Sequence, residues 1–312
     1  MFQATRAVFF YAISPVHMGA GSAIGAIDSP IQREVHTGHP MFAGAGLKGA
    51  LRHHFNDAWP RGGADGRKPH PLIARIFGPD TNESDFAGAL ALGDAQLVAL
   101  PVQCARKGFA YATSPIALAR ARRLLGLAGC QLALPGEVPA DGEALVADEG
   151  VLTNGRLLLE TYDFRARVVP AVASTGNALA SWAMGNEAFF AGKLEQDLVI
   201  LSDTDFAHLA RQSMVVEPHV RIDDESGTAS DGGLFYVENL PPESLMVALA
   251  YASAERGRVP DGEPRLDATA VLEVTFDGRD GLPGIHGGVL QVGGDASTGR
   301  GLVQVRTCHG KG

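Results

Sequence analysis

Two glycine-rich segments in this sequence have the residue types and spacing that could hold a phosphate. In residues 293–301 (GGDASTGRG), glycines at both ends flank a short polar loop that carries Arg300. Glycine permits positive φ and lets backbone N–H groups approach an anion closely, and arginine adds a charge-assisted contact. We therefore predict an anion-binding loop with Gly293, Gly294 and Arg300 as candidate contacts. Because neither a P-loop nor a GxGxxG motif is present, a plain hairpin turn is the alternative.

The second segment, residues 44–52, reads GAGLKGALR and predicts a glycine-rich turn that opens into a helix. A helix N-terminus exposes unpaired N–H donors at the positive end of the helix dipole, which favours a phosphate there. Lys48 and Arg52 are spaced i, i+4 on one face, where like charges repel unless an anion lies between them. The alternative is two solvated charges on a helix surface.

Asp28 is the third candidate, in a loop followed by Ser29 and Pro30. The proline favours extended backbone at the residue before it. A single aspartate, with no paired carboxylate or neighbouring histidine in the sequence, is more typical of a turn or a cap than of catalysis. Arg33 and Glu34 predict a local ion pair more readily than a ligand site.

The histidines do not have the spacing of metal ligands. His36 and His39 lie in a stretch broken by a glycine and a proline, and His53 and His54 are adjacent and would point in different directions. No HExxH motif, GxSxG elbow or catalytic Cys/His signature is present. These patterns argue against a structural zinc site and against the common hydrolase classes.

Composition places the chain among globular proteins, with 46% hydrophobic residues and a formal net charge of −9. An acidic total argues against nucleic acid as a partner. Arginine, however, supplies all but five of the 26 basic residues, and it binds phosphate bidentately where lysine is a point charge. A GC-rich coding sequence would give the same bias.

The sequence also indicates a compartment. No apolar run reaches the about 18 residues of a membrane helix, and the first residues lack the pattern of a signal peptide, so we expect a cytoplasmic protein. Cys104, Cys130 and Cys308 form no CxxC pair. We therefore expect three reduced, buried thiols, with no disulfide framework and no zinc site.

The elements that must position these residues are those of an α+β sheet. Strands are expected at 5–13, 88–102 with a break near 93–94, 245–252, 288–292 and 302–305. Helices are expected at 44–55 with Leu47, Leu51 and Phe55 on its apolar face, at 114–126, and at 203–212 with an aspartate cap. Two β-rich runs, 214–222 and 233–238, predict a β-ribbon with a polar tip, and 135–155 reads as an acidic insertion that need not belong to the core. Because strands and helices do not alternate regularly, we do not expect a doubly wound dinucleotide fold.

Taken in chain order, several segments resemble the RAMP superfamily. They are His17-x-Gly-x-Gly, IDSPIQRE at 27–34, TGHP at 37–40, LKGALR at 47–52 and the 293–301 loop, with support from LSDTDF at 201–206 and LFYVENLP at 234–241. More narrowly, they are similar to the repeated backbone subunit of type III-B (Cmr) CRISPR effector complexes, and the PIQRE wording separates them from the type III-A (Csm) subunit. The similarity runs from residue 1 to about 305 and is least specific at about 103–175.

This resemblance implies one domain over 1–312, a modified RRM-like (ferredoxin-like) palm with inserted segments. A variable insertion is expected at about 103–175 and a β-ribbon thumb at about 214–240. The implied partners are CRISPR RNA, complementary target RNA, further copies of the chain stacked head to tail, and other subunits of the effector complex. The implied activity is endoribonuclease cleavage of the target RNA at regular intervals, beside each base that a thumb displaces.

The resemblance also assigns roles to residues of this chain. It makes Asp28 the catalytic residue and Glu238 a weaker candidate near the scissile phosphate. The implied guide-RNA contacts are His17, Arg33, Lys48, Arg52, Gly293, Gly294 and Arg300. We expect the 2′-OH of the displaced nucleotide to attack the adjacent phosphate, with Asp28 acting as general base or holding a divalent ion, Mg²⁺, shared with the RNA phosphates.

One departure from the family pattern concerns the start of the 44–55 helix. The family usually carries serines just before Leu-Lys-Gly, whereas this chain has Ala45 and Gly46. Hydroxyl contacts to phosphate would be lost while the backbone donors remain, so we expect weaker RNA contact there. Two other functions stay open: a guide-RNA scaffold in which Asp28 is structural, and a metabolic enzyme that binds a nucleotide in the glycine segments.

Overall fold

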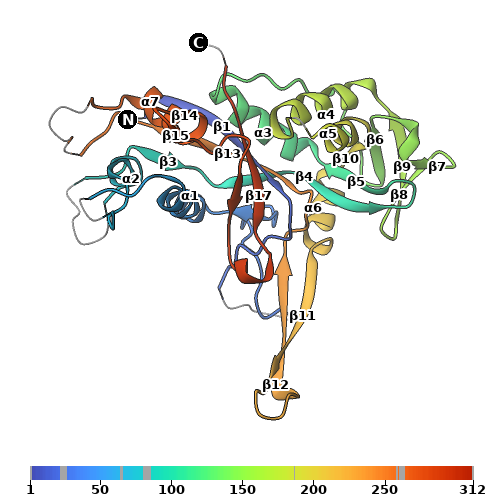
Figure 1. The fold of residues 1–312 in the computed structure, drawn as a ribbon. Coiled ribbons are helices and arrows are strands. Elements are labelled where there is room, and N and C mark those ends of the chain that lie inside the picture. Colours follow the sequence, from blue (N-terminus) through green and yellow to red (C-terminus); the bar gives the residue numbers. More distant parts are fainter. Residues whose placement is uncertain are drawn as a thin grey trace.

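The computed structural model describes residues 2–21, 27–63, 66–79, 86–185, 187–257, 259 and 264–310. At its centre lie four antiparallel strands in the order β17-β1-β13-β4 (Figure 1). Their bounds are Ala4–Ala12 (β1), Ala95–Cys104 (β4), Leu245–Ala252 (β13) and Leu302–Cys308 (β17). Helix α1 (Gly44–Ala58) lies between β1 and β4 in the chain, and α7 (Ala268–Leu272) lies between β13 and β17. This βαββαβ order is that of the ferredoxin-like fold, and it confirms the expected α+β palm.

Strand β1 separates two cores because its side chains alternate between the two faces of the sheet. Val8 and Phe10 belong to the core that includes Leu47 and Leu51 of α1. Phe9 and Tyr11 belong to the other core, which lies under the helices that follow β5 and β9. The helix predicted at 44–55 therefore packs with its predicted apolar face inward.

The connection from β4 to β13 builds a second, barrel-like part of the sheet. Its strands are β5 (Gly108–Thr113), β6 (Glu143–Val146), β7 (Leu152–Thr153), β8 (Arg156–Leu159), β9 (Tyr162–Val168) and β10 (Leu198–Leu201). They follow β4 in the order β5-β10-β6-β9-β8-β7, and β8 pairs back with β4 at Cys104 and Leu159. The 135–155 stretch, predicted to be an acidic insertion that need not belong to the core, contributes β6, whose Ala144, Leu145 and Val146 are buried. The short apolar run of β6 was not recognised as a strand because glycines, prolines and acidic residues surround it in the sequence.

The remaining elements cover or extend this sheet. The helices are α2 (Pro71–Phe77), α3 (Pro115–Leu127), α4 (Pro170–Ala183), α5 (Ala188–Gln196) and α6 (Asp203–Gln212). Short helical turns are η1 (Glu149–Val151), η2 (Glu273–Asp277) and η3 (Ala296–Thr298). The short strands are β2 (Met41–Phe42), β3 (Leu90–Leu92), β14 (Gly278–Arg279), β15 (Leu282–Pro283) and β16 (Val289–Gln291).

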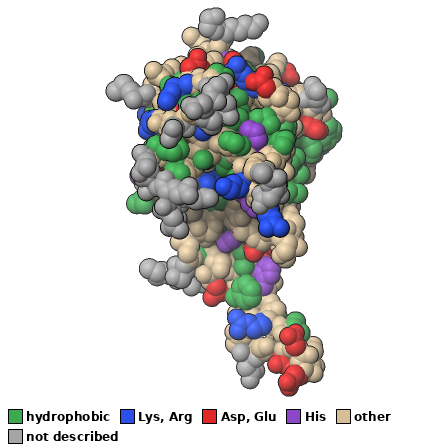
Figure 2. Space-filling model, turned by 60° about the vertical axis from the view of Figure 1, so that its left-hand side comes forward, with side chains coloured by type: hydrophobic (Ala, Val, Ile, Leu, Met, Phe, Trp, Pro, Cys, Tyr) green, Lys and Arg blue, Asp and Glu red, His purple; other side chains and the backbone are tan. Residues whose placement is uncertain are grey.

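The predicted β-ribbon is present and projects from the body of the molecule (Figure 1). It consists of β11 (Val215–Ile222) and β12 (Ala229–Asn239), paired antiparallel as a separate sheet. Acidic side chains gather at its far end in Figure 2, where Asp223, Asp224 and Glu225 are all exposed. Because like charges repel, this tip disfavours contact with a phosphate backbone.

Two local expectations were wrong. Helix α6 is capped by the Ser202 hydroxyl, which accepts a hydrogen bond from the Asp205 N–H, and not by an aspartate. Cys130, just after α3, and Cys308, at the end of β17, form a disulfide, while Cys104 is free and buried. The sequence could not indicate this pair because 178 residues separate its members and only the fold brings them together. Within the described residues, no helix has the length and apolar character needed to cross a membrane.

Candidate nucleic-acid interface

Asp28 lies on a short extended segment that pairs with the edge of β12. Ser29 and Val237 form a parallel bridge, and the Ser29 N–H donates to the carbonyl of Tyr236 at 3.1 Å. Asp28 Oδ2 accepts a hydrogen bond of 2.8 Å from the Tyr236 N–H. Pro218 is tolerated opposite Tyr236 because both backbone groups of Tyr236 turn away from β11 toward the Asp28 segment. Main-chain contacts therefore fix Asp28 while its side chain stays exposed.

Glu238, two residues further along β12, is buried, with a side chain only 5% exposed. Its Oε2 accepts from the Ile31 N–H at 3.0 Å, and its own N–H donates to the Ser29 carbonyl at 2.9 Å. Its Oε1 accepts from Arg33 Nη2 at 2.5 Å. Both carboxylate oxygens thus have partners inside the protein.

Arg33 does not pair with its neighbour Glu34, contrary to the local ion pair expected from the sequence. Its guanidinium donates to Glu238 Oε1, and Nη1 donates to the carbonyls of Gly38 and Ala210, each at 2.8 Å. The two adjacent side chains point to different elements because residues 31–34 are extended. The prediction that Arg33 and Glu34 pair with each other, which rested on their proximity in the sequence, was therefore wrong.

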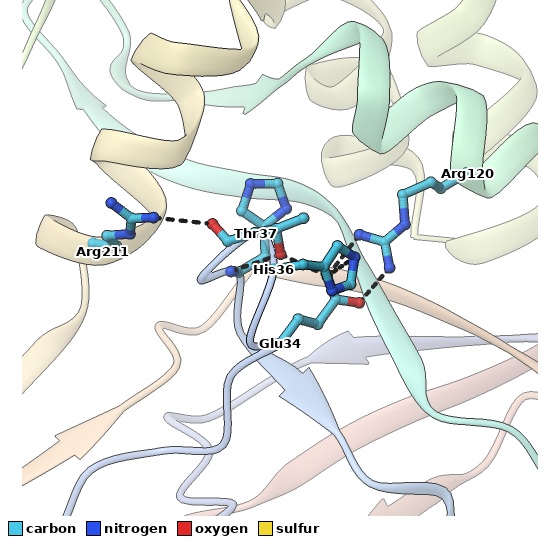
Figure 3. A network of polar contacts seen from close by, with 6 residues as sticks. Glu34, His36, Thr37, Arg120 and Arg211 are labelled. Atoms are coloured by element: carbon cyan, nitrogen blue, oxygen red, sulfur yellow. Dashed lines mark hydrogen bonds and ion pairs between the residues drawn. The ribbon is translucent and has the colours of Figure 1, made fainter.

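Glu34 instead forms a polar network with α3 (Figure 3). Arg120 holds both carboxylate oxygens of Glu34, and the Thr37 hydroxyl donates to Oε2 at 2.6 Å. Burial opposes ionisation of Glu34, but these hydrogen bonds prevail and lower the pKa of its carboxyl. From the other side, Arg211 of α6 donates to the Thr37 carbonyl at 3.3 Å. The loop that follows Asp28 is thereby tied to α3 and α6.

His17 connects the glycine-rich loop of residues 293–301 to Glu238 in β12. His17 Nδ1 lies 2.7 Å from the Glu238 carbonyl, and the Gly294 N–H donates to the His17 carbonyl at 2.9 Å. Gly293 has φ +76°, and a Cβ there would lie 2.2 Å from the His17 carbonyl oxygen. Only glycine fits this position without moving the backbone. The segments around residues 17, 28, 238 and 293 are therefore one structural unit.

Arg300, in the same loop, is directed to the ribbon. Its Nη2 pairs with Glu217 Oε2 of β11, and its side chain is 23% exposed. The loop connects β16 to β17, in agreement with the alternative prediction of a hairpin turn. Its Gly301 N–H donates to the Pro15 carbonyl. It is thus both a turn and the part of the unit that contacts His17.

The basic residues of α1 form a separate charged group. Lys48 is half-buried, and burial, followed by the charges of Arg52 and Arg256, lowers the pKa of its ammonium. Within the described part of the chain no carboxylate contributes to the pKa shift at Lys48, and Arg52 donates to the Gly78 carbonyl at 3.0 Å. Three neighbouring cations favour an anion between them. Arg256 lies about 200 residues away in sequence, and no motif marks it.

Helix α1 also reaches the His17 segment. A Cβ at Gly46 would lie 2.8 Å from Met18 Cε, so the first turn of α1 packs on the residue after His17. One of the N–H groups at this helix start is already used, since the Gly44 N–H donates to Asp94 Oδ1 at 2.7 Å. Among the described residues no cluster of three or more His, Cys, Asp or Glu side chains could hold a metal on its own. Residues 22–26, between His17 and Asp28, lie outside the described part of the chain.

Comparison with known proteins places this site in a family. The model of the RAMP superfamily matches residues 9–304, so the chain belongs to the RAMP superfamily. A curated relative, the CRISPR system Cmr endoribonuclease Cmr4 of Pyrococcus furiosus, is 33% identical over 301 residues, which cover 96% of this chain and 94% of the relative. The chain is thus homologous to a Cmr4 over nearly its whole length.

Solved structures agree with this assignment. A crystal structure of oligomeric Cmr4 from Pyrococcus furiosus is 25% identical, covers 99% of both chains and has a TM-score of 0.69. A chain in the cryo-EM structure of the type III-B Cmr-beta bound to cognate target RNA has a TM-score of 0.70 over 98% of both chains. Its identity is 18%, so it shows the same fold.

Proposed function

We propose that this chain is the repeated backbone subunit of a type III-B CRISPR effector complex, and that it binds CRISPR RNA and cleaves complementary target RNA with Asp28 as its catalytic residue. The strongest support is the coincidence of two observations. The chain is 33% identical to a Cmr endoribonuclease over 96% of its length, and Asp28 is an exposed carboxylate held by the main-chain N–H of Tyr236 in β12 of the ribbon.

The guide RNA would contact the Lys48, Arg52 and Arg256 group through its phosphates. Base pairing between guide and target reads the sequence, so the protein needs backbone contacts and no base-edge contacts. Burial and the neighbouring arginines lower the pKa of the Lys48 ammonium, and a phosphate bound between the three cations would offset their repulsion. A few such contacts in each copy, repeated along the guide, offset the net charge of −9.

The cleavage step uses the target RNA as its own nucleophile. The 2′-OH of a displaced nucleotide attacks the adjacent phosphorus and the bond from phosphorus to the 5′ oxygen breaks. The leaving 5′ oxygen takes a proton from water, so that a 2′,3′-cyclic phosphate and a 5′-OH result. Splaying the backbone aligns the attack, which is largely an effect of orientation. Asp28 accepts the 2′-OH proton or helps to hold a cation at the phosphate.

Mg²⁺ fits this site only if RNA supplies most of its ligands. Asp28 offers a single carboxylate, one of whose oxygens already accepts from the Tyr236 N–H. Mg²⁺ in proteins is commonly held by one or two carboxylates together with substrate phosphates, and it would stabilise the negative charge that develops on the phosphate. Asp28 would be its protein ligand.

The test is cleavage of end-labelled complementary RNA by the assembled complex. Asp28→Ala removes both the charge and the acceptor for Tyr236, whereas Asp28→Asn keeps an acceptor oxygen and removes only the charge. We expect both variants to assemble and both to lose the regular ladder of products. Asp57→Asn, which removes an exposed carboxylate on α1, is the matched control and should cleave normally.

The same experiment decides between the enzyme and the scaffold. A ladder that persists in Asp28→Asn but disappears in Asp28→Ala would make Asp28 a structural cap for the Tyr236 N–H. A ladder unchanged in both would move catalysis to another residue or subunit. Chelation of divalent ions, with Mg²⁺ restored afterwards, tests the metal separately.

A further inference from the structure

We propose that Arg33 is a positioning residue that holds the Asp28 segment in place through Glu238, and that neither Arg33 nor Glu238 contacts RNA. This deepens the proposed function and rests on it. It also replaces the roles that the family resemblance assigned to these two residues, a guide-RNA contact and catalytic support.

Three of the five N–H donors of the Arg33 guanidinium are used inside the protein. Its two terminal nitrogens make three hydrogen bonds of 2.5–2.8 Å to Glu238, Gly38 and Ala210, from three different elements. The side chain is only 23% exposed. A phosphate that approached Nη1, or the Nη2 hydrogen that Glu238 holds, would break one of these bonds and leave a buried carbonyl or carboxylate without its donor, which is costly.

Glu238 connects this arginine to both ends of the Asp28 segment. Its Oε2 holds the Ile31 N–H, its main-chain N–H holds the Ser29 carbonyl, and its carbonyl lies 2.7 Å from His17 Nδ1. With a side chain 5% exposed it cannot reach a scissile phosphate without rotating. The ion pair therefore fixes the rotamer that supports the segment from Ser29 to Ile31.

Loss of Arg33 would act on Asp28 through this chain of contacts. Glu238 would be left as a buried carboxylate without a counter-charge, and it would turn toward water. The Ile31 N–H would then lose its acceptor, and the segment that carries Asp28 would shift on the edge of β12. A displacement of about 1 Å at a reacting group lowers a rate by about 100-fold.

The decisive measurement separates guide binding from cleavage. For the assembled wild-type complex and for Arg33→Ala, Arg33→Lys, Glu238→Gln and Arg33→Ala/Glu238→Gln, we would measure guide-RNA affinity against salt and the single-turnover rate of target cleavage. Lys48→Ala is the positive control for a phosphate contact. Arg122→Ala, an exposed arginine on α3, is the negative control.

We expect Arg33→Ala and Glu238→Gln to bind guide RNA with the wild-type salt slope and to cleave about 10- to 100-fold more slowly. Arg33→Lys should restore little, because one ammonium cannot hold three acceptors arranged for a planar fork. The double variant should be no slower than the slower single variant, since both substitutions break the same contact. Lys48→Ala should reduce the salt slope by about 0.7.

Three results would overturn the proposal. One is a reduced salt slope in Arg33→Ala, which would make Arg33 a phosphate contact. Another is a wild-type rate of cleavage in Arg33→Ala. The third is a double variant whose loss of rate equals the product of the losses in the two single variants. If the wild-type complex did not cleave, the proposed function would fail, while the salt slope would still decide whether Arg33 touches RNA.

Discussion

Burial separates residues of the same type into different roles in this protein. Asp28 and Glu238 are both carboxylates at the ribbon, but Asp28 is exposed and held through Oδ2, whereas Glu238 is buried with both oxygens occupied. The family resemblance made Asp28 the catalytic residue and Glu238 a weaker candidate. It could not give their accessibility, since this depends on which strand covers which side chain. The same holds for Arg33, whose acceptor at Ala210 is far away in the chain.

At the residue scale, His39 predicts a pH dependence of stability. Burial lowers the pKa of His39 to about 4, and Arg120 and Arg211 add to this effect while Glu34 and Asp203 oppose it. The unfolded chain therefore binds a proton at His39 between pH 6.5 and 4 that the folded chain does not bind, so stability is full above pH 6.5 and falls as the pH is lowered toward 4.

Replacement of His39 with Gln tests this dependence. We expect the melting temperature of the variant to change less between pH 7.5 and 5 than that of the wild type. Glu34 also makes stability depend on pH, but its pKa is lowered, so its contribution is lost only at lower pH. This contribution is the same in both proteins and does not affect the comparison. Equal pH dependence in the two proteins would show that His39 is accessible to protons in the folded state.

At the element scale, the sequence predicted those helices and strands whose hydrophobic pattern can be recognised within the element itself. The strand at 5–13, the 44–55 helix and the ribbon were each confirmed within a few residues. Strand β6 was missed because three apolar residues among glycines and acids carry no period, and Arg256 was missed because only the tertiary fold brings it near α1. The family resemblance supplied the roles that isolated motifs could not.

The glycine-rich loop allows a matched pair of substitutions. Gly293 and Gly299 have nearly the same φ, +76° and +79°, so alanine at either position should cost about 1–2 kcal/mol of backbone strain. Only at Gly293 would the new Cβ meet the chain, 2.2 Å from the His17 carbonyl, while nothing lies within 4 Å at Gly299. We expect Gly293→Ala to lose target cleavage at least tenfold more than Gly299→Ala does, measured at matched fractions of assembled complex. Equal losses would show that the contact with His17 does not matter.

At the scale of the whole molecule, one covalent bond joins the two parts of the fold. The Cys130–Cys308 disulfide links the segment after α3, in the long connection from β4 to β13, to the last strand of the palm. Closing so long a loop constrains mainly the unfolded chain. The bond therefore raises the free energy of the unfolded chain and so stabilises the folded one.

Thiol counting checks this bond directly. In denaturant without reductant, the wild-type chain should show one reactive thiol, from Cys104, and three after reduction. Cys308→Ser should lower stability by about 3 kcal/mol under oxidising conditions and should have little effect in the presence of a reductant. Three thiols in the unreduced protein would mean that Cys130 and Cys308 are reduced. The melting temperatures of the wild type and of Cys308→Ser should then be the same.

The last prediction concerns how many copies of the chain make one site. Three residues of the same chain hold Asp28 in place: Tyr236 holds the carboxylate, Glu238 supports the segment, and Arg33 supports Glu238. Copies stacked on one guide should therefore cleave independently, each beside its own displaced base. In complexes assembled from mixtures of wild-type chain and Asp28→Ala, every band of the ladder should weaken in direct proportion to the fraction of variant. A loss that follows the square of the wild-type fraction would mean that two neighbouring copies must both carry Asp28 to complete a site.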